Sequence, residues 1–337
     1  MNQFLRRRFL VASAAMIAAP LADAEQGRKT YRVAFVLGAS PPKVMAGPEP
    51  PHPIVRAFIH EMRDLGYVEG QNLVLERRSL ESHQDRFPTI FTELAKLDTQ
   101  VIVSIGGREE LKQACDAVSP TPVVLFAVGD PEKYGLAKSL AHPGGNVTGL
   151  KYYAGDELEA KRLQVFRDAM PGLTRASYLV PKEAVEKKDL IVEAARRAAH
   201  TLGIELLLAT YEGHNFAEAF AVIAQQKPGA LFVSPYPAIY AYRKEVVALA
   251  RKARLPDAYS WPELVQVGGL ISYGVNTPDL GRRAAQYVDK ILKGAKPGDL
   301  PFEQPTRFDL VVNLRTAREL GLTMPPSVLV RATQVIE

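Results

Sequence analysis

The sequence predicts an α/β protein of two lobes, each built on a parallel sheet with helices on both faces. Short apolar runs rich in β-branched residues alternate with longer amphipathic segments from Tyr31 onward. The turn-rich stretch 142–146 interrupts this alternation, which then begins again. The chain has 337 residues, 47% of them hydrophobic. That length suits about two domains, each large enough to bury a core.

In the first half of the chain, four apolar runs predict strands. They are Arg32 to Leu37, Asn72 to Glu76, Val101 to Ile105 and Pro122 to Val128. Between the first two, Ile54, Phe58 and Met62 recur at helical spacing, and Gly66 supplies a helix stop. Further helical spacing follows the second and third strands. Continuous apolar strands separated by helices are typical of a parallel sheet covered on both faces.

The second half repeats this order after Val147 to Leu150. The predicted strands are Ala176 to Val180, Ile204 to Ala209, Ala230 to Ser234 and Leu270 to Tyr273. Amphipathic spacing between them predicts helices, and a further helix is predicted from Pro278 to Lys293, with Gly294 as its stop. Periodicity alone does not assign the last segments to either lobe.

The amino-terminal residues have the pattern of an export signal. Arg6-Arg7-Arg8 precedes the apolar run Phe9 to Ala19, and Ala22-Asp23-Ala24 follows as a small-residue cleavage site. The apolar run is shorter than the ~20 residues that a spanning helix needs. We therefore expect a signal peptide over residues 1–24 and a periplasmic product. Export by the twin-arginine route and export by the general secretory route both fit the arginines.

Charge and cysteine content exclude several classes of protein. Removal of residues 1–24 takes away three arginines and Asp23, which lowers the net charge from +5 to +3. We interpret the pairs Arg77-Arg78, Arg196-Arg197 and Arg282-Arg283 as solvated faces, so neither a nucleic acid nor a membrane partner is expected. Cys115 is the one cysteine, so it can form no intramolecular disulfide.

The motifs of enzymes and cofactor sites are missing from the sequence. Ser104-Ile105-Gly106-Gly107 lies at a strand-to-turn junction but lacks the flanking glycines of a nucleophile elbow. No Gly-rich loop ends in Gly-Lys-Ser/Thr, and the six histidines lack metal-site spacing. Glu157 and Glu159 are interpreted as solubilising charges. We expect no enzymatic activity, no cofactor and no metal.

Binding is the remaining class of function. In parallel α/β sheets, ligands lie at the carboxyl ends of the strands, beside helix amino termini. The expected ligand-binding residues are Ala39, Ser40, Ser104, Gly106, Gly107, Arg108, Gly129, Asp130, Ser234, Pro235, Tyr236, Trp261, Tyr273 and Gly274. Gly106 and Gly107 would let a ligand carboxylate approach backbone N–H groups. Arg108 would either add a bidentate contact or lie at the surface, paired with Glu109 or solvent.

Four aromatic residues fall at or just after predicted strand ends. Tyr236, Tyr259, Trp261 and Tyr273 could together form an aromatic wall for a planar ligand. An aromatic residue in such a position, taken alone, is more often part of the core or its rim, and it is the four together that favour a wall.

Long blocks of the sequence resemble one family. They are Leu65-Gly66-Tyr67-Val68-Glu69-Gly70-Gln71-Asn72, Asp130-Pro131, His142-Pro143-Gly144-Gly145-Asn146-Val147-Thr148-Gly149, Gly269-Leu270-Ile271-Ser272-Tyr273-Gly274 and Lys290-Ile291-Leu292-Lys293-Gly294-Ala295-Lys296-Pro297. Leu300-Pro301, Gln304-Pro305-Thr306, Val311-Val312-Asn313-Leu314 and Pro325-Pro326-Ser327 continue the match. Together they resemble the ABC transporter substrate-binding proteins of the tryptophan/tyrosine type.

This resemblance implies a type I periplasmic binding fold, in which two lobes are joined by three crossovers. Lobe 1 would comprise residues 31–149 and 276–304, and lobe 2 residues 150–274 and 306–337. It also implies a monomeric receptor that binds an aromatic amino acid or a related carboxylate between the lobes and delivers it to an ABC permease. A sensing subunit for a membrane signalling receptor is the alternative, followed by an exported α/β hydrolase.

Three features depart from the family pattern at loops expected to touch the ligand. Arg108-Glu109 stands where the family usually has small residues, and Glu132-Lys133-Tyr134 follows Asp130-Pro131. The loop 38–53 is long and contains six prolines. Such a loop either holds Ser40 in place at low entropic cost or forms a surface excursion.

Overall fold

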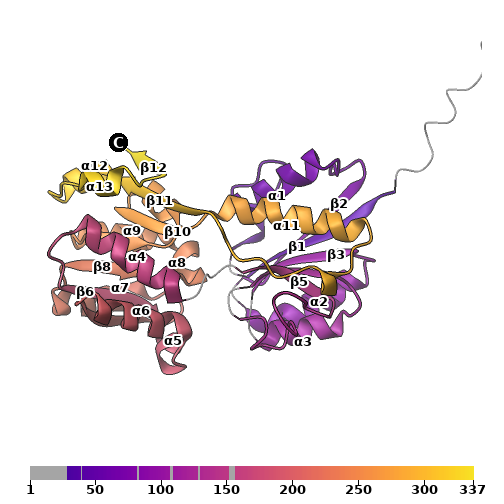
Figure 1. Cartoon of the computed structure of the whole chain (residues 1–337), viewed down its shortest axis with the longest axis horizontal. Helices are drawn as coiled ribbons and strands as arrows, with labels where there is room; N and C mark the ends of the chain where they lie inside the picture. The colour runs from indigo at the N-terminus through magenta and orange to yellow at the C-terminus, as the bar shows by residue number, and fades with distance from the viewer. Residues whose placement is uncertain (1–28, 39, 82, 107–108, 128–129, 152–155) are drawn as a thin grey trace, which may run out of the picture.

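The computed structural model describes residues 29–337 except 39, 82, 107–108, 128–129 and 152–155. Figure 1 shows two α/β lobes lying side by side and connected by extended chain. The predicted signal peptide lies outside the described residues. Where the chain is described, no helix has the length and apolar character needed to cross a membrane.

Lobe 1 is built on a five-stranded sheet of order β2-β1-β3-β4-β5, in which every neighbouring pair is parallel. Its strands are β1 (Tyr31–Leu37), β2 (Leu73–Ser79), β3 (Val101–Gly106), β4 (Val123–Ala127) and β5 (Val147–Lys151). Its helices are α1 (Pro53–Asp64), α2 (Phe87–Ala95) and α3 (Glu109–Ala117), with the 3-10 turns η1 (Pro42–Met45) and η2 (Gln84–Arg86). The apolar runs predicted as strands are buried at the centre of this lobe.

A later segment completes lobe 1. Helix α11 (Thr277–Leu292) lies along α1 in Figure 1, although more than 200 residues separate them in the sequence. Gly281 makes this approach possible, because a Cβ there would lie 2.3 Å from the carbonyl oxygen of Ile54. The turn η3 (Pro297–Asp299) follows and packs against β5. Lobe 1 therefore depends on a helix supplied from the far end of the chain.

Lobe 2 is built on a seven-stranded sheet of order β12-β11-β10-β9-β8-β6-β7. Its strands are β6 (Arg175–Pro181), β7 (Glu205–Tyr211), β8 (Ala230–Val233), β9 (Asp257–Tyr259), β10 (Ile271–Val275), β11 (Phe308–Asn313) and β12 (Gln334–Ile336). The expectation of a wholly parallel sheet is wrong at one position, because β10 and β11 are antiparallel. The chain enters β11 from the inter-lobe side, after crossing over from lobe 1, and so runs opposite to β10.

Helices cover both faces of this second sheet. They are α4 (Asp156–Ala169), α5 (Lys182–Glu186), α6 (Leu190–Thr201), α7 (Phe216–Gln226), α8 (Pro237–Ala241), α9 (Arg243–Lys252), α10 (Pro262–Gln266), α12 (Leu314–Glu319) and α13 (Pro326–Leu329). Two buried clusters lie on opposite faces of the sheet, one centred on Phe166 and Phe232 and the other on Phe216 and Tyr259. The lobe is thus a three-layer sandwich with its own core.

The chain passes between the lobes after β5, between β10 and α11, and before β11 (Figure 1). These segments are hydrogen-bonded to one another. Glu303 accepts from the N–H of Lys151 at 2.8 Å, and the N–H of Asn276 donates to the carbonyl of Arg307 at 2.9 Å. The Asn276 side chain also donates to Asp309 at 2.8 Å. Adjacent crossing segments, joined by hydrogen bonds, therefore form the hinge between the lobes.

Candidate functional site

The carboxyl ends of β8, β9 and β10 form the best-described part of the inter-lobe edge. Phe232 pairs with Ala258, and Tyr259 pairs with Ser272. Continuing this register places Ser234, Ser260 and Tyr273 in one row across three neighbouring strands. The sequence predicted Ser234 and Tyr273 but missed Ser260, because a three-residue strand gives no periodic signal.

The row contains two hydroxyls that lack partners. Ser234 and Ser260 are 1% and 4% exposed, and within the described part of the chain neither Oγ makes a hydrogen bond. A buried hydroxyl without a partner costs free energy that a ligand oxygen or nitrogen would recover. These two hydroxyls make the edge of lobe 2 a candidate site for a polar group.

Gly274 permits the close packing of this edge. A Cβ at Gly274 would lie 1.9 Å from the carbonyl oxygen of Ser260, which no side chain could accommodate. The glycine lets β10 approach the segment after β9 and so fixes the position of Ser260. This packing role accounts for Gly274 without any contact to a ligand.

The aromatic residues divide into a half-buried one and several buried ones. Tyr273 is partly exposed and stacks on Phe308, with ring centroids 6.0 Å apart and planes 13° apart. Burial raises the pKa of the Tyr273 hydroxyl, so it stays a neutral donor. Tyr236 and Trp261 are 7% and 5% exposed and show little ring surface.

The expectation that Tyr259 joins an aromatic wall is wrong. Its ring is fully buried in the core of lobe 2, and its hydroxyl donates to Asp257 at 2.6 Å. The alternation of side chains along β9 turns Tyr259 away from the strand-end row and toward the helix layer.

Only some of the residues predicted at the edge of lobe 1 lie within the described part of the chain. The predicted residues Ala39, Gly107, Arg108 and Gly129 lie outside the described residues. Gly106 ends β3, and Ser104 is fully buried with no hydrogen bond to its Oγ from the described part of the chain. The backbone carbonyl of Ser40 accepts from Ser79 at 2.6 Å.

Of two further predicted residues, Asp130 follows β4 in lobe 1 and Pro235 follows β8 in lobe 2. The Asp130 carboxylate accepts from the N–H of Glu132 at 3.0 Å, a bond that shapes the turn. Pro235 lies half-buried between Ser234 and Tyr236.

Glu159 is buried in an ion pair beside the hinge, contrary to expectation. Glu159 was interpreted as a solubilising charge, but its side chain is 1% exposed and pairs with Arg162 on α4. Arg162 in turn donates from Nε to the carbonyl of Tyr273 at 2.9 Å. Because the start of α4 packs against β10, this face of the helix is buried, and the pair supports the backbone that carries Tyr273.

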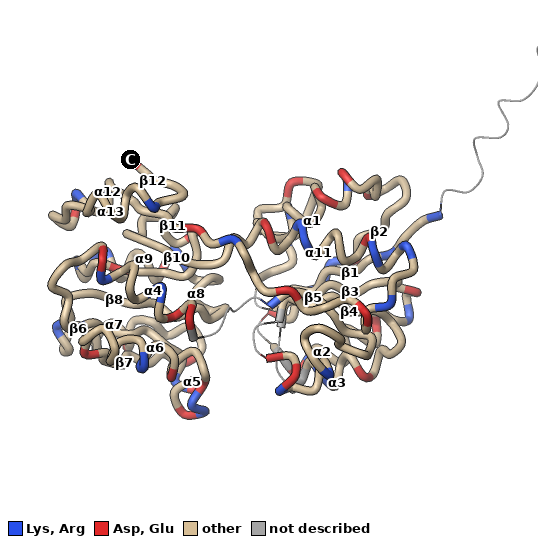
Figure 2. Tube along the Cα trace, in the orientation of Figure 1, with Lys and Arg blue, Asp and Glu red and all other residues tan. Residues whose placement is uncertain are grey.

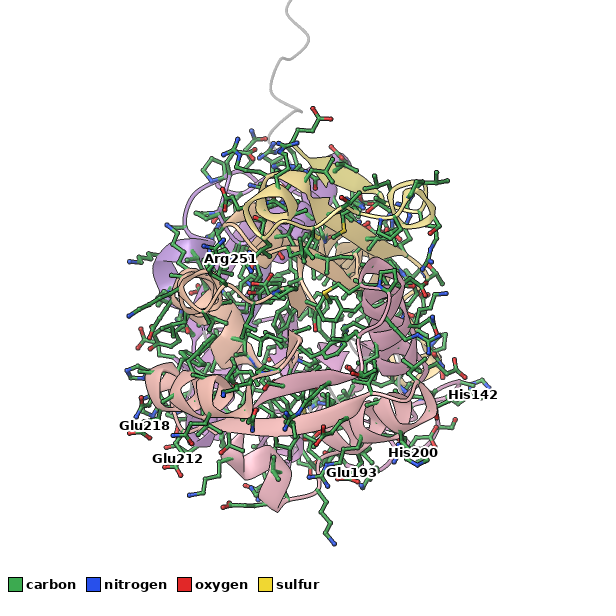
Figure 3. The ribbon with its side chains drawn as sticks, turned by 90° about the vertical axis from the view of Figure 1, so that its left-hand side faces the viewer. His142, Glu193, His200, Glu212, Glu218 and Arg251 are labelled. Carbon is green, nitrogen blue, oxygen red and sulfur yellow. The ribbon has the colours of Figure 1, made fainter. Side chains whose placement is uncertain are left out.

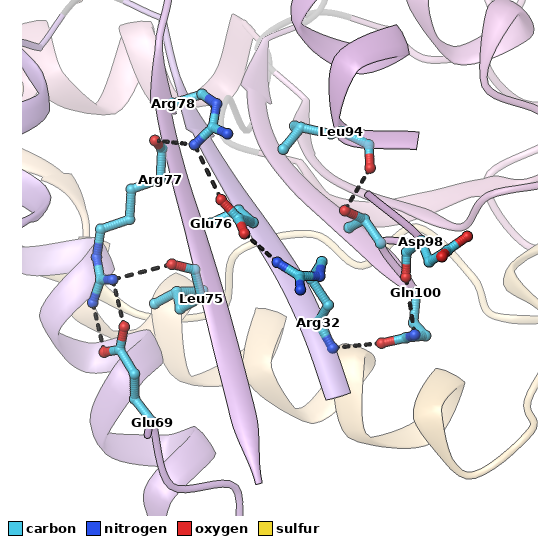
Figure 4. Close-up of polar contacts among 10 residues, drawn as sticks. Arg32, Glu69, Leu75, Glu76, Arg77, Arg78, Leu94, Asp98 and Gln100 are labelled. Atoms are coloured by element: carbon cyan, nitrogen blue, oxygen red, sulfur yellow. Dashed lines mark hydrogen bonds and ion pairs between the residues drawn. The ribbon is translucent and has the colours of Figure 1, made fainter. Parts of the chain in front are cut away.

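The arginine pair Arg77-Arg78 is also not a freely solvated face. Arg77 forms a bidentate pair with Glu69 at 2.6 and 2.7 Å, and Arg78 contacts Glu76 at 3.2 Å. Figure 4 shows this ladder of ion pairs along the outer strands of lobe 1. Positive and negative residues are interspersed along the chain in both lobes (Figure 2).

A cavity of about 510 Å³ lies between the lobes beside this site. The proline-rich loop, defined here as residues 38–53, forms one wall, and residues 240–245 of α8 and α9 form the other. His52 contributes from lobe 1, with its ring 5.8 Å from that of Tyr240. The sequence drew attention to the loop but not to its facing helix, which comes from a distant part of the chain.

Acidic, histidine and cysteine side chains do not assemble a metal site within the described ranges of the chain. His142 and His200 point outward at the periphery in Figure 3, as do Glu193, Glu212 and Glu218.

Comparison with solved structures finds the same architecture. A conserved domain protein from Vibrio cholerae superposes with a TM-score of 0.79 at 25% identity, covering 91% of this chain and 100% of that one. An ABC domain from Streptococcus pneumonia, solved in complex with L-Trp, superposes with a TM-score of 0.78 at 25% identity over 91% of this chain and 100% of that one. The fold is that of the type I periplasmic binding proteins.

Sequence comparison agrees with the structural result. A tyrosine-binding protein from Clostridioides difficile is 24% identical over 270 residues, which cover 79% of this chain and 76% of that protein. The family model described as "ABC transporter substrate binding protein" matches residues 51–336. The chain therefore belongs to the family of ABC transporter substrate-binding proteins.

Proposed function

We propose that this protein binds an aromatic amino acid, or a closely related aromatic carboxylate, between its lobes and delivers it to an ABC permease. The observation that carries the proposal is the row of Ser234, Ser260 and Tyr273, in which unpaired hydroxyls lie beside a half-buried aromatic ring. Two similar proteins support the ligand class, one named for tyrosine and one solved with L-Trp.

Binding would act by shifting the population of lobe orientations. A ligand that contacts both lobes stabilises the closed arrangement relative to the open one, and the permease would recognise the closed form. Micromolar affinity corresponds to about −8 kcal/mol, which a few hydrogen bonds and one aromatic contact can supply. The process needs no cofactor and no bond cleavage.

The site of action follows from the amino-terminal pattern. We propose that residues 1–24 direct export to the periplasm and are then removed, and that the mature receptor acts as a monomer. Mass spectrometry of protein from the periplasmic fraction tests the cleavage. A mass beginning at Glu25 supports it, whereas full-length protein in the cytoplasm contradicts it.

Transport and sensing make different predictions for uptake. If the protein serves a permease, deletion of its gene abolishes import of the bound solute. If it serves a signalling receptor, import persists and only the response to the solute is lost.

The hydrolase alternative depends on Ser104. Its Oγ is fully buried and has no hydrogen-bonded base among the described residues, whereas a serine nucleophile requires one. Turnover of a generic ester that disappeared in the Ser104→Ala variant would revive this alternative.

A binding experiment tests the ligand and the site together. Mass spectrometry of co-purified small molecules, followed by a thermal-shift panel of aromatic amino acids and acids, identifies the ligand. Calorimetry should then show about a fivefold to tenfold loss of affinity in Ser234→Ala and in Ser260→Ala.

A matched serine controls this experiment. Ser272 is also fully buried with an unpaired Oγ in the described part of the chain, but it faces away from Tyr273 in β10. Ser272→Ala should leave affinity unchanged. Equal affinity in all three variants would show that the row is not the binding site.

A further inference from the structure

The proline-rich loop, which forms one wall of the cavity, is held to lobe 1 by hydrogen bonds. The Oγ of Ser79 donates to the carbonyl of Ser40 at 2.6 Å, and Nε of Arg77 donates to the carbonyl of Met45 at 2.8 Å. The N–H of His52 donates to the carbonyl of Val44 at 3.0 Å, and the Met45 side chain is fully buried. Figure 4 shows Arg77 held in turn by Glu69. The loop is therefore anchored to lobe 1.

The opposite wall presents oriented cationic groups. Arg243 lies over the Tyr240 ring, 5.1 Å from its centroid, and donates from Nη1 to the Tyr240 carbonyl at 3.0 Å. Lys244 follows on the same helix, and Lys43 contributes from the loop in lobe 1. Cations from both lobes therefore line one cavity.

These charges lack compensation within the described structure. Lys43, Arg243 and Lys244 oppose Glu245, which leaves the lining with a formal charge of +2. Among the ion pairs between described residues, none includes any of these three cations. Arg243 and Lys244 also begin α9, where the helix dipole disfavours positive charge. Lys43 and Lys244 are exposed and therefore solvated, and an anion in the cavity would attract both of them as well as the amino terminus of α9.

Glu263 is half-buried on α10 and interacts electrostatically with Arg243, but it lies beyond ion-pair distance of that side chain in the described structure. Burial raises the pKa of its carboxyl group, and Arg243 opposes that shift.

The His52 side chain supplies a ring nitrogen that could bind an oxyanion. It lines the cavity, is 8% exposed, and its Nδ1 has no hydrogen-bond partner in the described part of the chain. Burial and the nearby Arg243 lower its pKa to about 4, so the imidazole is neutral at pH 7. A neutral imidazole can still donate one N–H to an oxygen acceptor.

We propose that this cavity is a binding site for a small oxyanion, a carboxylate or a phosphate. The His52 imidazole donates to the anion, and Lys43, Arg243 and Lys244 surround it from both lobes. Because each lobe supplies part of the site, the bound anion favours the closed arrangement. The cavity and the predicted ligand site share Ser40. The anion is therefore either a second acidic group of the transported ligand or a separate small ion, and only the first source depends on the proposed function.

Inorganic phosphate tests the site directly. It is titrated into the mature protein at constant ionic strength, with Trp261 fluorescence as one readout and the His52 ring resonances as the other. Trp261 is the one tryptophan, and its ring lies 5.5 Å from that of the cavity residue Tyr240. We expect a saturable change, and a rise in the His52 pKa because a neighbouring anion stabilises the imidazolium.

Charge variants locate the binding. Lys43→Ala and Lys244→Ala should each weaken phosphate binding about tenfold. Lys252→Ala, an exposed lysine at the other end of α9, is the matched control and should bind as the parent does. The absence of a saturable change up to roughly 50 mM phosphate, or equal binding in Lys43→Ala, Lys244→Ala and the control, would overturn the proposal.

Comparing aromatic ligands that carry one acidic group with those that carry two distinguishes an anionic group of the ligand from a separate ion. If the anion belongs to the ligand, Lys43→Ala weakens the dicarboxylate and spares the monocarboxylate. If it is a separate ion, phosphate tightens binding of the monocarboxylate in the parent and not in Lys43→Ala. If phosphate binds and none of the aromatic ligands in the panel binds, the proposed function fails and this site stands. If an aromatic ligand binds and phosphate does not, this site fails and the proposed function stands.

Discussion

The two lobes share an architecture but differ in what lies inside them. Lobe 1 has five parallel strands and cores of aliphatic and aromatic side chains. Lobe 2 has seven strands, one antiparallel pair, and a buried ionic group on β9. There Asp257 is fully buried and accepts from Arg251 at 2.5 Å, from Tyr259 at 2.6 Å and from the N–H of Leu270 at 2.7 Å.

This difference shows how each lobe fixes its inter-lobe edge. In lobe 1, long strands and apolar packing hold the strand ends. In lobe 2, β9 has only three residues, and the Asp257 network ties it to α9 and to the segment before β10. We infer that the hydrogen bonds and the ion pair of Asp257 hold the strand ends of lobe 2 in place, as strand length does in lobe 1. The position of Ser260 then depends on these polar bonds.

The largest expected effect tests this inference at Asp257. Asp257→Ala leaves Tyr259 and the N–H of Leu270 without their acceptor and leaves Arg251 with the Leu255 carbonyl alone, so it should lower the free energy of unfolding by about 3–5 kcal/mol. Urea denaturation of the mature chain measures the loss. The exposed pair of Arg175 and Glu205 provides the control, since Glu205→Ala should cost less than about 1 kcal/mol. Similar losses in the free energy of unfolding for the two variants would show that the Asp257 network does not stabilise lobe 2.

Glycines at close backbone contacts give the next largest effect, one in each lobe. Gly149→Ala would place a Cβ 2.0 Å from the Leu125 carbonyl oxygen, and Gly274→Ala would place one 1.9 Å from that of Ser260. Each should cost roughly 1–3 kcal/mol in urea denaturation. In addition, Gly274→Ala should weaken ligand binding, because it displaces the row that contains Ser260.

Gly145→Ala is the control for both variants, because a Cβ there has no atom within 4 Å. If Gly274→Ala unfolded as easily as expected but bound ligand normally, the row would not be part of the site.

Acid should weaken the contact between the lobes through His52. The pKa of His52 is about 4 in the folded chain against 6.5 for the free side chain, so the unfolded chain binds more protons between these values. Stability should therefore fall as the pH is lowered from 6.5 to 4, by roughly 2 kcal/mol at pH 4.5. His52→Gln should flatten this part of a stability profile. His60→Gln, a change at an exposed histidine, should leave the profile intact.

The smallest expected effect lies at the hinge. The Asn276 side chain caps α11 by accepting from the N–H of Asp279 at 2.8 Å, and it also donates to Asp309. Asn276→Ala should lower thermal stability by about 1 kcal/mol. Asn215 precedes α7 but makes no side-chain cap bond, so Asn215→Ala should change little. A larger loss at Asn215 would contradict the assigned role of the cap.

Sequence reasoning succeeded where apolar runs are long. The strands predicted from Arg32 to Leu37 and from Val101 to Ile105 correspond to β1 and β3 within one residue at each end. It missed β9, because three residues carry no period. It also predicted no strand at β11, and periodicity would not have given the direction in which that returning strand enters the sheet.

The candidate site was predictable only where a residue follows a recognised strand. Ser234 and Tyr273 met that condition, and Ser260 did not. Glu159 was misassigned because the sequence gives no sign that the first turn of α4 packs under the Tyr273 backbone. The cavity opposite the proline-rich loop joins segments nearly 200 residues apart, so no local pattern could have predicted it.

We expect an aromatic amino acid to close the two lobes on each other. Small-angle scattering of the mature chain, with and without saturating L-tryptophan or L-tyrosine, measures this closure directly. We expect the radius of gyration to fall with a concentration dependence that matches the calorimetric affinity. A radius of gyration and a melting temperature that both stay unchanged across the panel of aromatic acids would contradict the account.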